Sequence, residues 1–163
     1  MGEATELVLR EMIAGEADAL GRVMFRAIRE GPSAYTEAQR AAWCAAPHAG
    51  EAWARKLAAQ DVVVAEAQGA PVGFVTRVGA YVDLAFVLPE WQGRGVFSAL
   101  CARTEHDARA AGLHRLRVHA SLMAQPAFAA RGFRLIRHET VERHGQTSDR
   151  AEMEKVWVVS AER

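Results

Sequence analysis

Two glycines and two polar side chains are closely spaced where a β-prone segment gives way to a helix-forming one. Residues 88–100 read LPEWQGRGVFSAL, with Gln92, Gly93, Arg94 and Gly95 just before the helical stretch. The first amides of a helix have no intrahelical partner, and the helix dipole adds partial positive charge there. Glycines let the backbone approach an anion without intervening Cβ atoms. The spacing therefore predicts a phosphate-binding turn; an ordinary strand–helix turn is the alternative.

This segment fits neither of two common nucleotide motifs. A Walker A loop requires Gly-Lys-Ser/Thr at its end, which is absent, and a dinucleotide fingerprint requires a third glycine where Ser98 stands. Residues 61–88, before the turn, are predicted to be consecutive strands, unlike the alternating strands and helices of a dinucleotide fold. The sequence thus excludes both motifs.

The elements around the turn follow from changes in hydrophobic period. Helices are predicted at 17–28, 36–43, 51–59, 96–111 and 126–131, and strands at 5–10, 61–67, 72–78, 81–88, 115–119, 133–139 and 153–159. We order them as β-α-α-β-β-β-α-β-α-β-β, with residues 51–59 as a further helix. The prediction is an α/β fold with a mixed, mostly antiparallel sheet flanked by helices, in a single domain over residues 1–163.

Composition limits the possible partners. Half of the 163 residues are hydrophobic and the formal net charge is zero, which gives no electrostatic reason to expect nucleic acid or an anionic membrane. The acidic start MGEATE is not a signal peptide, and the apolar runs are too short to cross a bilayer. Cys44 and Cys101 are typical of reduced thiols. We expect a cytoplasmic monomer or homodimer.

The polar clusters give no metal site. Cys44 and His48 are four residues apart, but Pro47 interrupts the helix and no further ligands lie nearby in the sequence. The same interruption argues against a Cys–His nucleophile pair. No metal is expected.

Two segments resemble one enzyme superfamily. VLPEWQGRG, residues 87–95, is similar to the acetyl-CoA signature of the GNAT N-acetyltransferases, in which V-x-P leads into Gln/Arg-x-x-Gly-x-Gly/Ala. Residues 124–133, ending in RGF, resemble the family's A-x-x-F-Y-x-x-x-G-F segment, and the predicted element order matches as well. The segments AYTEAQRAAW, YVDLAFVLPE, VHASLMAQPAF and HETVERHG resemble the small bacterial YafP-like subgroup.

The resemblance implies acetyl-CoA as co-substrate. Loop amides would bind its pyrophosphate, and the amide near Val87 would bind the acetyl carbonyl and stabilise the oxyanion. The residues implied to bind acetyl-CoA are Phe86, Val87, Gln92, Gly93, Arg94, Gly95, Val96, Phe97, Ser121 and Phe128.

Two positions depart from the family pattern. Phe97 stands where Gly or Ala is expected, although its backbone amide remains available. Phe128 replaces the tyrosine that in many members protonates the leaving thiolate, so either another group donates or none is needed. Ser121 is the nearest hydroxyl that we nominate for this catalytic role; the alternative is a serine that caps the following turn.

Asp83 is the candidate general base. Strand alternation would place it on the same side as Ala85 and Val87, near the expected reaction centre. An ammonium acceptor must lose a proton before it attacks, and some members of the family carry a carboxylate here. The alternative is a carboxylate that is bound by a neighbouring strand or a structural arginine.

The acceptor is expected to be a small-molecule primary amine that binds Tyr35, Trp43 and Tyr81. The resemblance implies recognition by the first two helices and their loop, where Tyr35 and Trp43 lie, with Tyr81 on the central strand. An aromatic-lined pocket would suit an aromatic amine, an amino acid or a drug-like molecule; for Trp43 the alternative is packing in the core. Trp53 and Trp157 are expected in the core. Transfer would be direct, in a ternary complex. Alternatives are a peptide, protein lysine or charged tRNA acceptor, or a GNAT-fold protein that binds CoA or a ligand without turnover.

Overall fold

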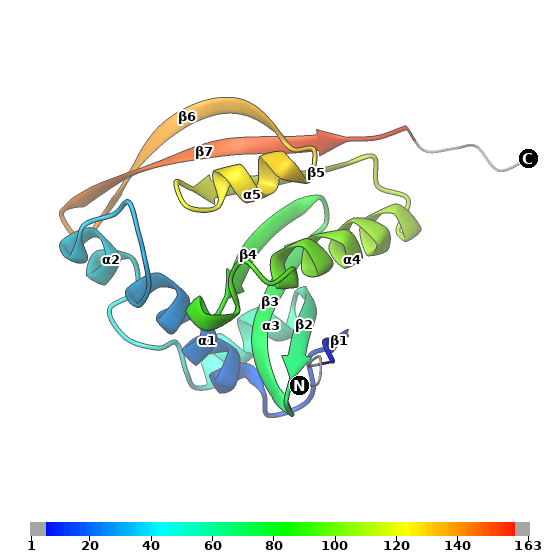
Figure 1. The fold of residues 1–163 in the computed structure, drawn as a ribbon, viewed down its shortest axis with the longest axis horizontal. Coiled ribbons are helices and arrows are strands. Elements are labelled where there is room, and N and C mark those ends of the chain that lie inside the picture. Colours follow the sequence, from blue (N-terminus) through cyan, green and yellow to red (C-terminus); the bar gives the residue numbers. More distant parts are fainter. Residues whose placement is uncertain (1–5, 159–163) are drawn as a thin grey trace, which may run out of the picture.

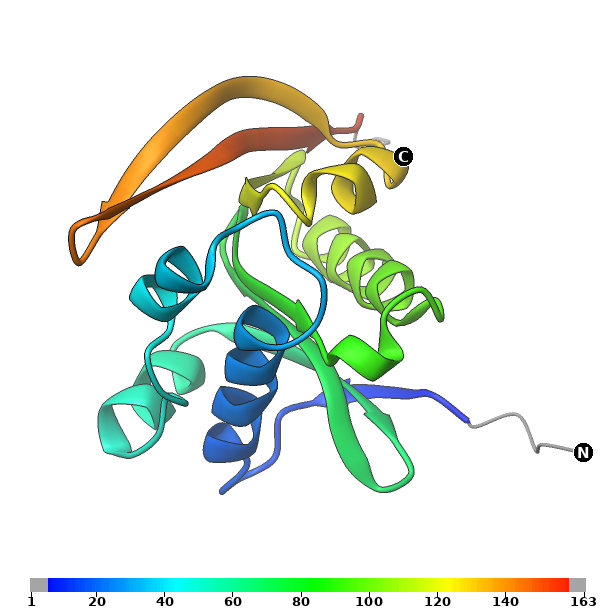
Figure 2. The same ribbon diagram turned by 60° about the vertical axis from the view of Figure 1, so that its left-hand side comes forward.

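A seven-stranded sheet with helices on both faces makes up the computed structural model, which describes residues 6–158 (Figures 1 and 2). The strand order is β1-β2-β3-β4-β5-β7-β6, and every neighbouring pair is antiparallel except β4 and β5. The strands are β1 (Val8–Glu11), β2 (Asp61–Ala67), β3 (Ala70–Val78), β4 (Tyr81–Val87), β5 (Arg115–Ser121), β6 (Arg134–Arg143) and β7 (Gln146–Val156). The helices are α1 (Ala17–Arg29), α2 (Glu37–Trp43), α3 (Glu51–Ala58), α4 (Val96–Ala110) and α5 (Gln125–Ala130), with a 3-10 turn, η1 (Pro89–Trp91). The predicted mixed α/β fold is confirmed, although three helices precede β2, one more than the predicted order counted.

The helices divide between the two faces of the sheet. Figure 2 shows α1, α2 and α3 on one side of the central strands and α4 on the other. The apolar stripe of α1 is buried against the sheet, as its helical spacing predicts: Leu20, Val23, Met24 and Ile28. No helix among residues 6–158 is both long and apolar enough to cross a membrane.

Two local signals in the sequence are confirmed at atomic detail. Thr36 and Gln39 form a capping box at the start of α2, in which each side chain accepts a hydrogen bond from the other residue's backbone amide. Trp53 and Trp157 are buried, and each indole N–H donates to a backbone carbonyl. The capping box depends on spacing within one helical turn, whereas the two tryptophans donate to carbonyls 36 and 44 residues away in the chain.

The feature that positions the site is the divergence of β4 from β5. The two strands pair only at Tyr81 with Arg117 and at Val82 with Val118. Beyond that point the edge of β4 that faces β5 has no paired strand, and Figure 1 shows the two strands separating. A gap in the middle of the sheet results.

The C-terminal hairpin is longer than predicted. Strands were expected at 133–139 and 153–159, but β6 and β7 extend through residues 140–152 to a tight turn at His144 and Gly145, both at positive φ. This stretch is strongly polar, so it has no apolar alternation to mark it. Cross-strand pairs such as Thr140 with Asp149 hold it together instead. Val159, and Thr5 of the predicted first strand, lie outside the described residues.

Candidate functional site

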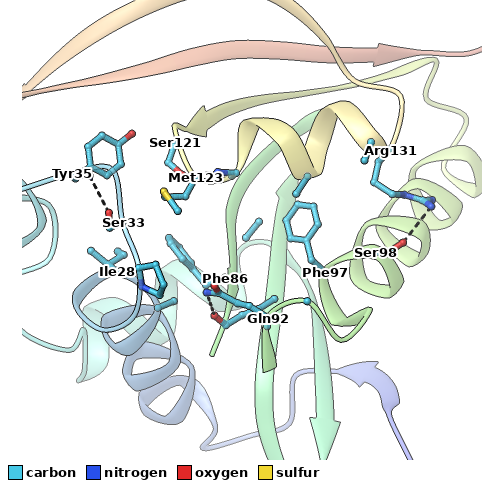
Figure 3. A pocket seen from close by; sticks show the side chains of 18 of the residues that line it. Ile28, Ser33, Tyr35, Phe86, Gln92, Phe97, Ser98, Ser121, Met123 and Arg131 are labelled. Atoms are coloured by element: carbon cyan, nitrogen blue, oxygen red, sulfur yellow. Dashed lines mark hydrogen bonds between the residues drawn. The ribbon is translucent and has the colours of Figure 1, made fainter. Parts of the chain in front are cut away.

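A cavity of about 500 Å³ occupies the gap between β4 and β5 (Figure 3). It runs from the turn before α4, past the diverging strands, to the loop between α1 and α2. Its lining residues are Ala27, Ile28, Pro32, Ser33, Tyr35, Trp43, Ala85, Phe86, Val87, Gln92, Gly93, Gly95, Phe97, Ser98, Ser121, Met123, Ala124, Ala127, Ala130 and Arg131.

The glycine turn presents a row of free backbone donors at one end of this cavity. Gly93 and Gly95 have φ values of 73° and 84°, in the left-handed region that favours glycine, and Gly95 is the N-cap of α4. The amides of residues 93–98 make no hydrogen bond to any group in residues 6–158, whereas the Ala99 amide already bonds the Gly95 carbonyl. Free amides at a helix start are the arrangement that binds phosphate.

The exposed edge of β4 offers further donors. The Leu84 amide donates to the Thr76 hydroxyl and the Leu88 amide donates to the Val72 carbonyl, both on the β3 side. Because successive amides of a strand point to opposite edges, the Ala85 and Val87 amides point into the gap. The Val87 amide, which the resemblance implies would bind the acetyl carbonyl, thus points into the gap. The Ala85 amide, which the sequence analysis did not name, points into it as well.

The two departures from the family pattern contact one another. Phe97 packs edge-on against Phe128, with ring centroids 5.0 Å apart, and Phe128 packs in the same way against Phe133. Phe128 is buried and does not line the cavity, whereas Phe97 does (Figure 3). The bulky side chain at position 97 therefore packs onto the ring that replaces the usual tyrosine, and its amide stays free.

Of the remaining residues expected to bind acetyl-CoA, three have side chains that line the cavity and two do not. Gln92 lines the cavity and donates from Nε2 to the Val87 carbonyl at 3.2 Å, and Phe86 and Ser121 also line it. Arg94 lies over the Trp91 ring, 4.0 Å from its centroid, and the Val96 side chain is buried in the core. Neither of these two side chains lines the cavity.

Arg131 is a cavity residue that the sequence analysis missed as a binding residue. It is the one charged side chain among the described lining residues, and its buried Nε has no hydrogen-bond partner within residues 6–158. Its guanidinium lies 3.5 Å from Ser98 Oγ and 3.9 Å from Glu105 (Figure 3). The sequence analysis used the Arg-Gly-Phe segment only as part of a family motif and assigned no binding role to Arg131.

The opposite end of the cavity is built from side chains rather than backbone. Tyr35 and Trp43 line it, with ring centroids 5.9 Å apart, and Trp43 contacts Phe86 at 6.0 Å. Tyr35 Oη donates to the Asp149 carbonyl at 2.6 Å and accepts from the Leu122 amide at 2.8 Å. Tyr35 thus joins the loop before α2 to β7 and to the end of β5, and it lines the cavity as predicted for an acceptor-binding residue.

Tyr81 is not part of this end. Its hydroxyl forms a 2.7 Å hydrogen bond with His119 Nδ1, and His119 Nε2 lies 3.5 Å from the Glu139 carboxylate, which also pairs with Arg150. Burial raises the pKa of Tyr81, and the charge of Asp83 raises it further. The structure places Tyr81 where β4 and β5 begin to diverge, outside the lining of the cavity.

Asp83 lies in a β-bulge, which overturns the side that simple alternation assigned to it. Val82 and Leu84 pair with consecutive residues of β3, so Asp83 is the extra residue on β4. An extra residue shifts the alternation of the residues that follow it by one position. Strand alternation therefore no longer assigns a side to Asp83, and its contacts decide the side.

The contacts of Asp83 show that the prediction that it shares a side with Ala85 and Val87 is wrong. Its carboxylate accepts a hydrogen bond from Gln60 Nε2 at 2.9 Å and lies 3.6 Å from Lys56 Nζ, at the end of α3. The Val87 side chain instead lies on the α4 face, beside Leu100 and Gly73. Asp83 does not line the cavity, and its catalytic role stays a prediction.

Comparison with known families decides what kind of protein has this architecture. Residues 32–155 match the family described as "Acetyltransferase (GNAT) domain". The chain belongs to the GNAT family. It is 33% identical over 141 residues to a protein of Escherichia coli strain K12 described as "Uncharacterized N-acetyltransferase YafP", a match that covers 84% of this chain and 87% of that protein.

Solved GNAT structures share the fold along nearly the whole chain. A GCN5-related N-acetyltransferase from Rhodopseudomonas palustris superposes with a TM-score of 0.84 at 28% identity, covering 96% of this chain and 99% of that one. A phosphinothricin acetyltransferase from Sinorhizobium meliloti, solved with acetyl-CoA, superposes with a TM-score of 0.70 at 20% identity, covering 96% and 92%. The protein is thus a GNAT acetyltransferase by family and by fold.

Proposed function

We propose that this protein transfers an acetyl group from acetyl-CoA to the primary amine of a small molecule, directly and in a ternary complex. The observation that carries the proposal is the row of free amides at residues 93–98, at one end of a cavity whose other end is lined by aromatic side chains. Acetyl-CoA supplies a thioester whose acetyl group is open to attack by an amine.

The residues present fit acetyl-CoA. The free amides, Gly93 and Gly95 among them, would bind the pyrophosphate, and Arg131 supplies a cation with an unused donor beside them. The Val87 and Ala85 amides would bind the pantetheine arm and the acetyl oxygen, since both point into the gap in the sheet. In a GNAT structure solved with acetyl-CoA, the same fold holds this molecule.

Proton transfer is assigned to two residues. An acceptor that arrives as an ammonium ion loses one proton before it attacks. As the amine nitrogen then bonds the acetyl carbon and the C–S bond breaks, a second proton leaves the nitrogen. The departing sulfur takes up one proton, and the other goes to solvent. Asp83 is the proposed base; because it lies outside the cavity lining, it would act through a water. Ser121, which lines the cavity, is the proposed donor to the departing sulfur.

Two observations favour a second candidate function, a protein that binds CoA without turnover. Phe128 has no hydroxyl, and the Asp83 carboxylate is already bound by Gln60 and Lys56. Position 128 thus lacks a hydroxyl that could donate a proton, and the carboxylate that could accept one is already paired.

The decisive experiment combines acetyl-CoA binding by calorimetry with CoA release in the presence of a panel of primary amines. We expect binding together with CoA release and an N-acetylated product for at least one amine. Binding without release on any amine favours the second candidate. No binding overturns both.

A further inference from the structure

Arg143, the last residue of β6, carries a positive charge that no acid of the described chain neutralises. Its guanidinium lies over the ring of Trp43, with Cζ 5.4 Å from the ring centroid. The side chain is half-buried, and within residues 6–158 it forms no hydrogen bond or ion pair with a carboxylate. A partly desolvated charge without an ionic partner is unfavourable, so this arrangement suits the arrival of an anion.

The neighbours of Arg143 leave its charge uncompensated. Burial lowers the pKa of the Arg143 guanidinium, and the nearby positive charge of Arg150 lowers it further. Arginine nevertheless stays protonated at neutral pH. Arg150 is paired with Glu139, and the Asp149 carboxylate accepts a hydrogen bond from the Thr140 hydroxyl. Arg134, on the same strand, also lacks an acidic partner among the described residues, but it is exposed, so Arg143 is the unpaired cation of this hairpin that is partly buried.

The hairpin places this charge at the aromatic end of the cavity. Figures 1 and 2 show the tip of the β6–β7 hairpin lying next to α2, and Arg143 stands one residue before the turn. Trp43, at the end of α2, lies under the guanidinium and also lines the cavity. An acceptor that packs on Trp43 therefore comes within reach of Arg143.

The cavity lacks what a simple cationic amine would need. No Asp or Glu is among its lining residues in the part of the chain that the structure describes, and its charged residue, Arg131, is on the α4 side. The aromatic end is lined by apolar and neutral side chains, with a positive charge at its margin. Such a surface disfavours polyamines and favours an acceptor that carries its own negative charge.

We propose that Arg143 binds a carboxylate of the acceptor, so that the acceptor is a small amine with an apolar or aromatic body and a carboxylate, as in an aromatic α-amino acid. The inference rests on the proposed function. Trp43 and Tyr35 contact the apolar body, and the guanidinium donates two parallel hydrogen bonds to the carboxylate.

The test compares two amines that differ only in the carboxylate, phenylalanine and phenethylamine. For wild type we expect kcat/KM to be at least about 10-fold higher with phenylalanine. Arg143→Gln should lower kcat/KM for phenylalanine about 10- to 100-fold and change that for phenethylamine less than about twofold. Arg143→Lys should recover part of the loss. The control is Arg134→Gln, which removes the same positive charge from an exposed position of the same strand. This variant should behave as wild type.

Binding of the products keeps this test independent of turnover. Calorimetry should show N-acetylphenylalanine binding more tightly than N-acetylphenethylamine to wild type, and equally to Arg143→Gln. Equal binding to wild type overturns the inference, as does an equal loss of kcat/KM for both amines in Arg143→Gln. If the products discriminate but no amine releases CoA from acetyl-CoA, the subsite stands and the proposed transferase function fails.

Discussion

The two ends of the cavity offer different kinds of group to a ligand. The end beside α4 uses backbone: the free amides of residues 93–98, which would bind a phosphate whatever side chains follow them. The end beside α2 uses side chains from distant segments, including Tyr35, Trp43 and, at its margin, Arg143. Most substitutions leave the amides of a backbone site unchanged. In a side-chain site, by contrast, one substitution can change which ligand binds. The proposed reaction would divide its two substrates in the same way, with acetyl-CoA at the backbone end and the acceptor at the side-chain end.

The largest effect is expected between the two ends, where the chemistry occurs. Asp83→Asn removes the proposed base and keeps its size and its bond to Gln60, so we expect kcat to fall about 100-fold or more. Acetyl-CoA affinity by calorimetry and the KM of the acceptor should change little. An unchanged kcat would show that Asp83 only anchors α3 to β4.

A substitution in the glycine turn should weaken the backbone end alone. Gly95→Ala puts a side chain at φ 84°, which costs about 1–2 kcal/mol, and a loop that relaxes out of this conformation misplaces its amides. We expect acetyl-CoA to bind about 5- to 30-fold more weakly, with the acceptor KM retained. Gly112→Ala, at φ 80° after α4 and away from the cavity, is the matched control. It should lower the free energy of unfolding without changing acetyl-CoA affinity.

The reverse pattern is expected for Tyr35→Phe. This change removes the hydrogen bonds to the Asp149 carbonyl and the Leu122 amide, so the free energy of unfolding should fall by about 1–3 kcal/mol. The loosened loop should raise the acceptor KM about 3- to 10-fold, while calorimetry finds acetyl-CoA affinity unchanged. A loss of acetyl-CoA affinity as large as that of Gly95→Ala would mean that the two ends are not separable.

The smallest effect on binding is expected for Phe97→Ala, although it lies in the glycine turn. If the loop binds through its amides, acetyl-CoA affinity should change less than about threefold. The lost packing on Phe128 should appear instead as lower thermal stability, because an aromatic pair contributes about 0.5–1.5 kcal/mol beyond burial. Phe97→Leu, which keeps most of the apolar contact, should recover stability. A large loss of affinity in both variants would show that the ring itself contacts the ligand.

Local spacing in the sequence determined much of the fold and the backbone half of the site. The apolar stripe of α1, the Thr36–Gln39 capping box and the glycines before α4 each depend on residues within about one helical turn or a few residues of one another. Signals of this range can be read without knowing what packs where. The phosphate-binding turn was predicted for the same reason.

Only the tertiary structure decided the side-chain half. The contact between Phe97 and Phe128, the bulge that turns Asp83 toward Gln60, and the placement of Arg143 over Trp43 all join residues far apart in the chain. A bulge depends on how the neighbouring strand pairs, and a polar hairpin such as β6–β7 has no apolar alternation to reveal its length. The sequence by itself therefore determined the family and the glycine turn at one end of the cavity. Long-range packing decided which side chains meet at the aromatic end, because no local pattern encodes those distances.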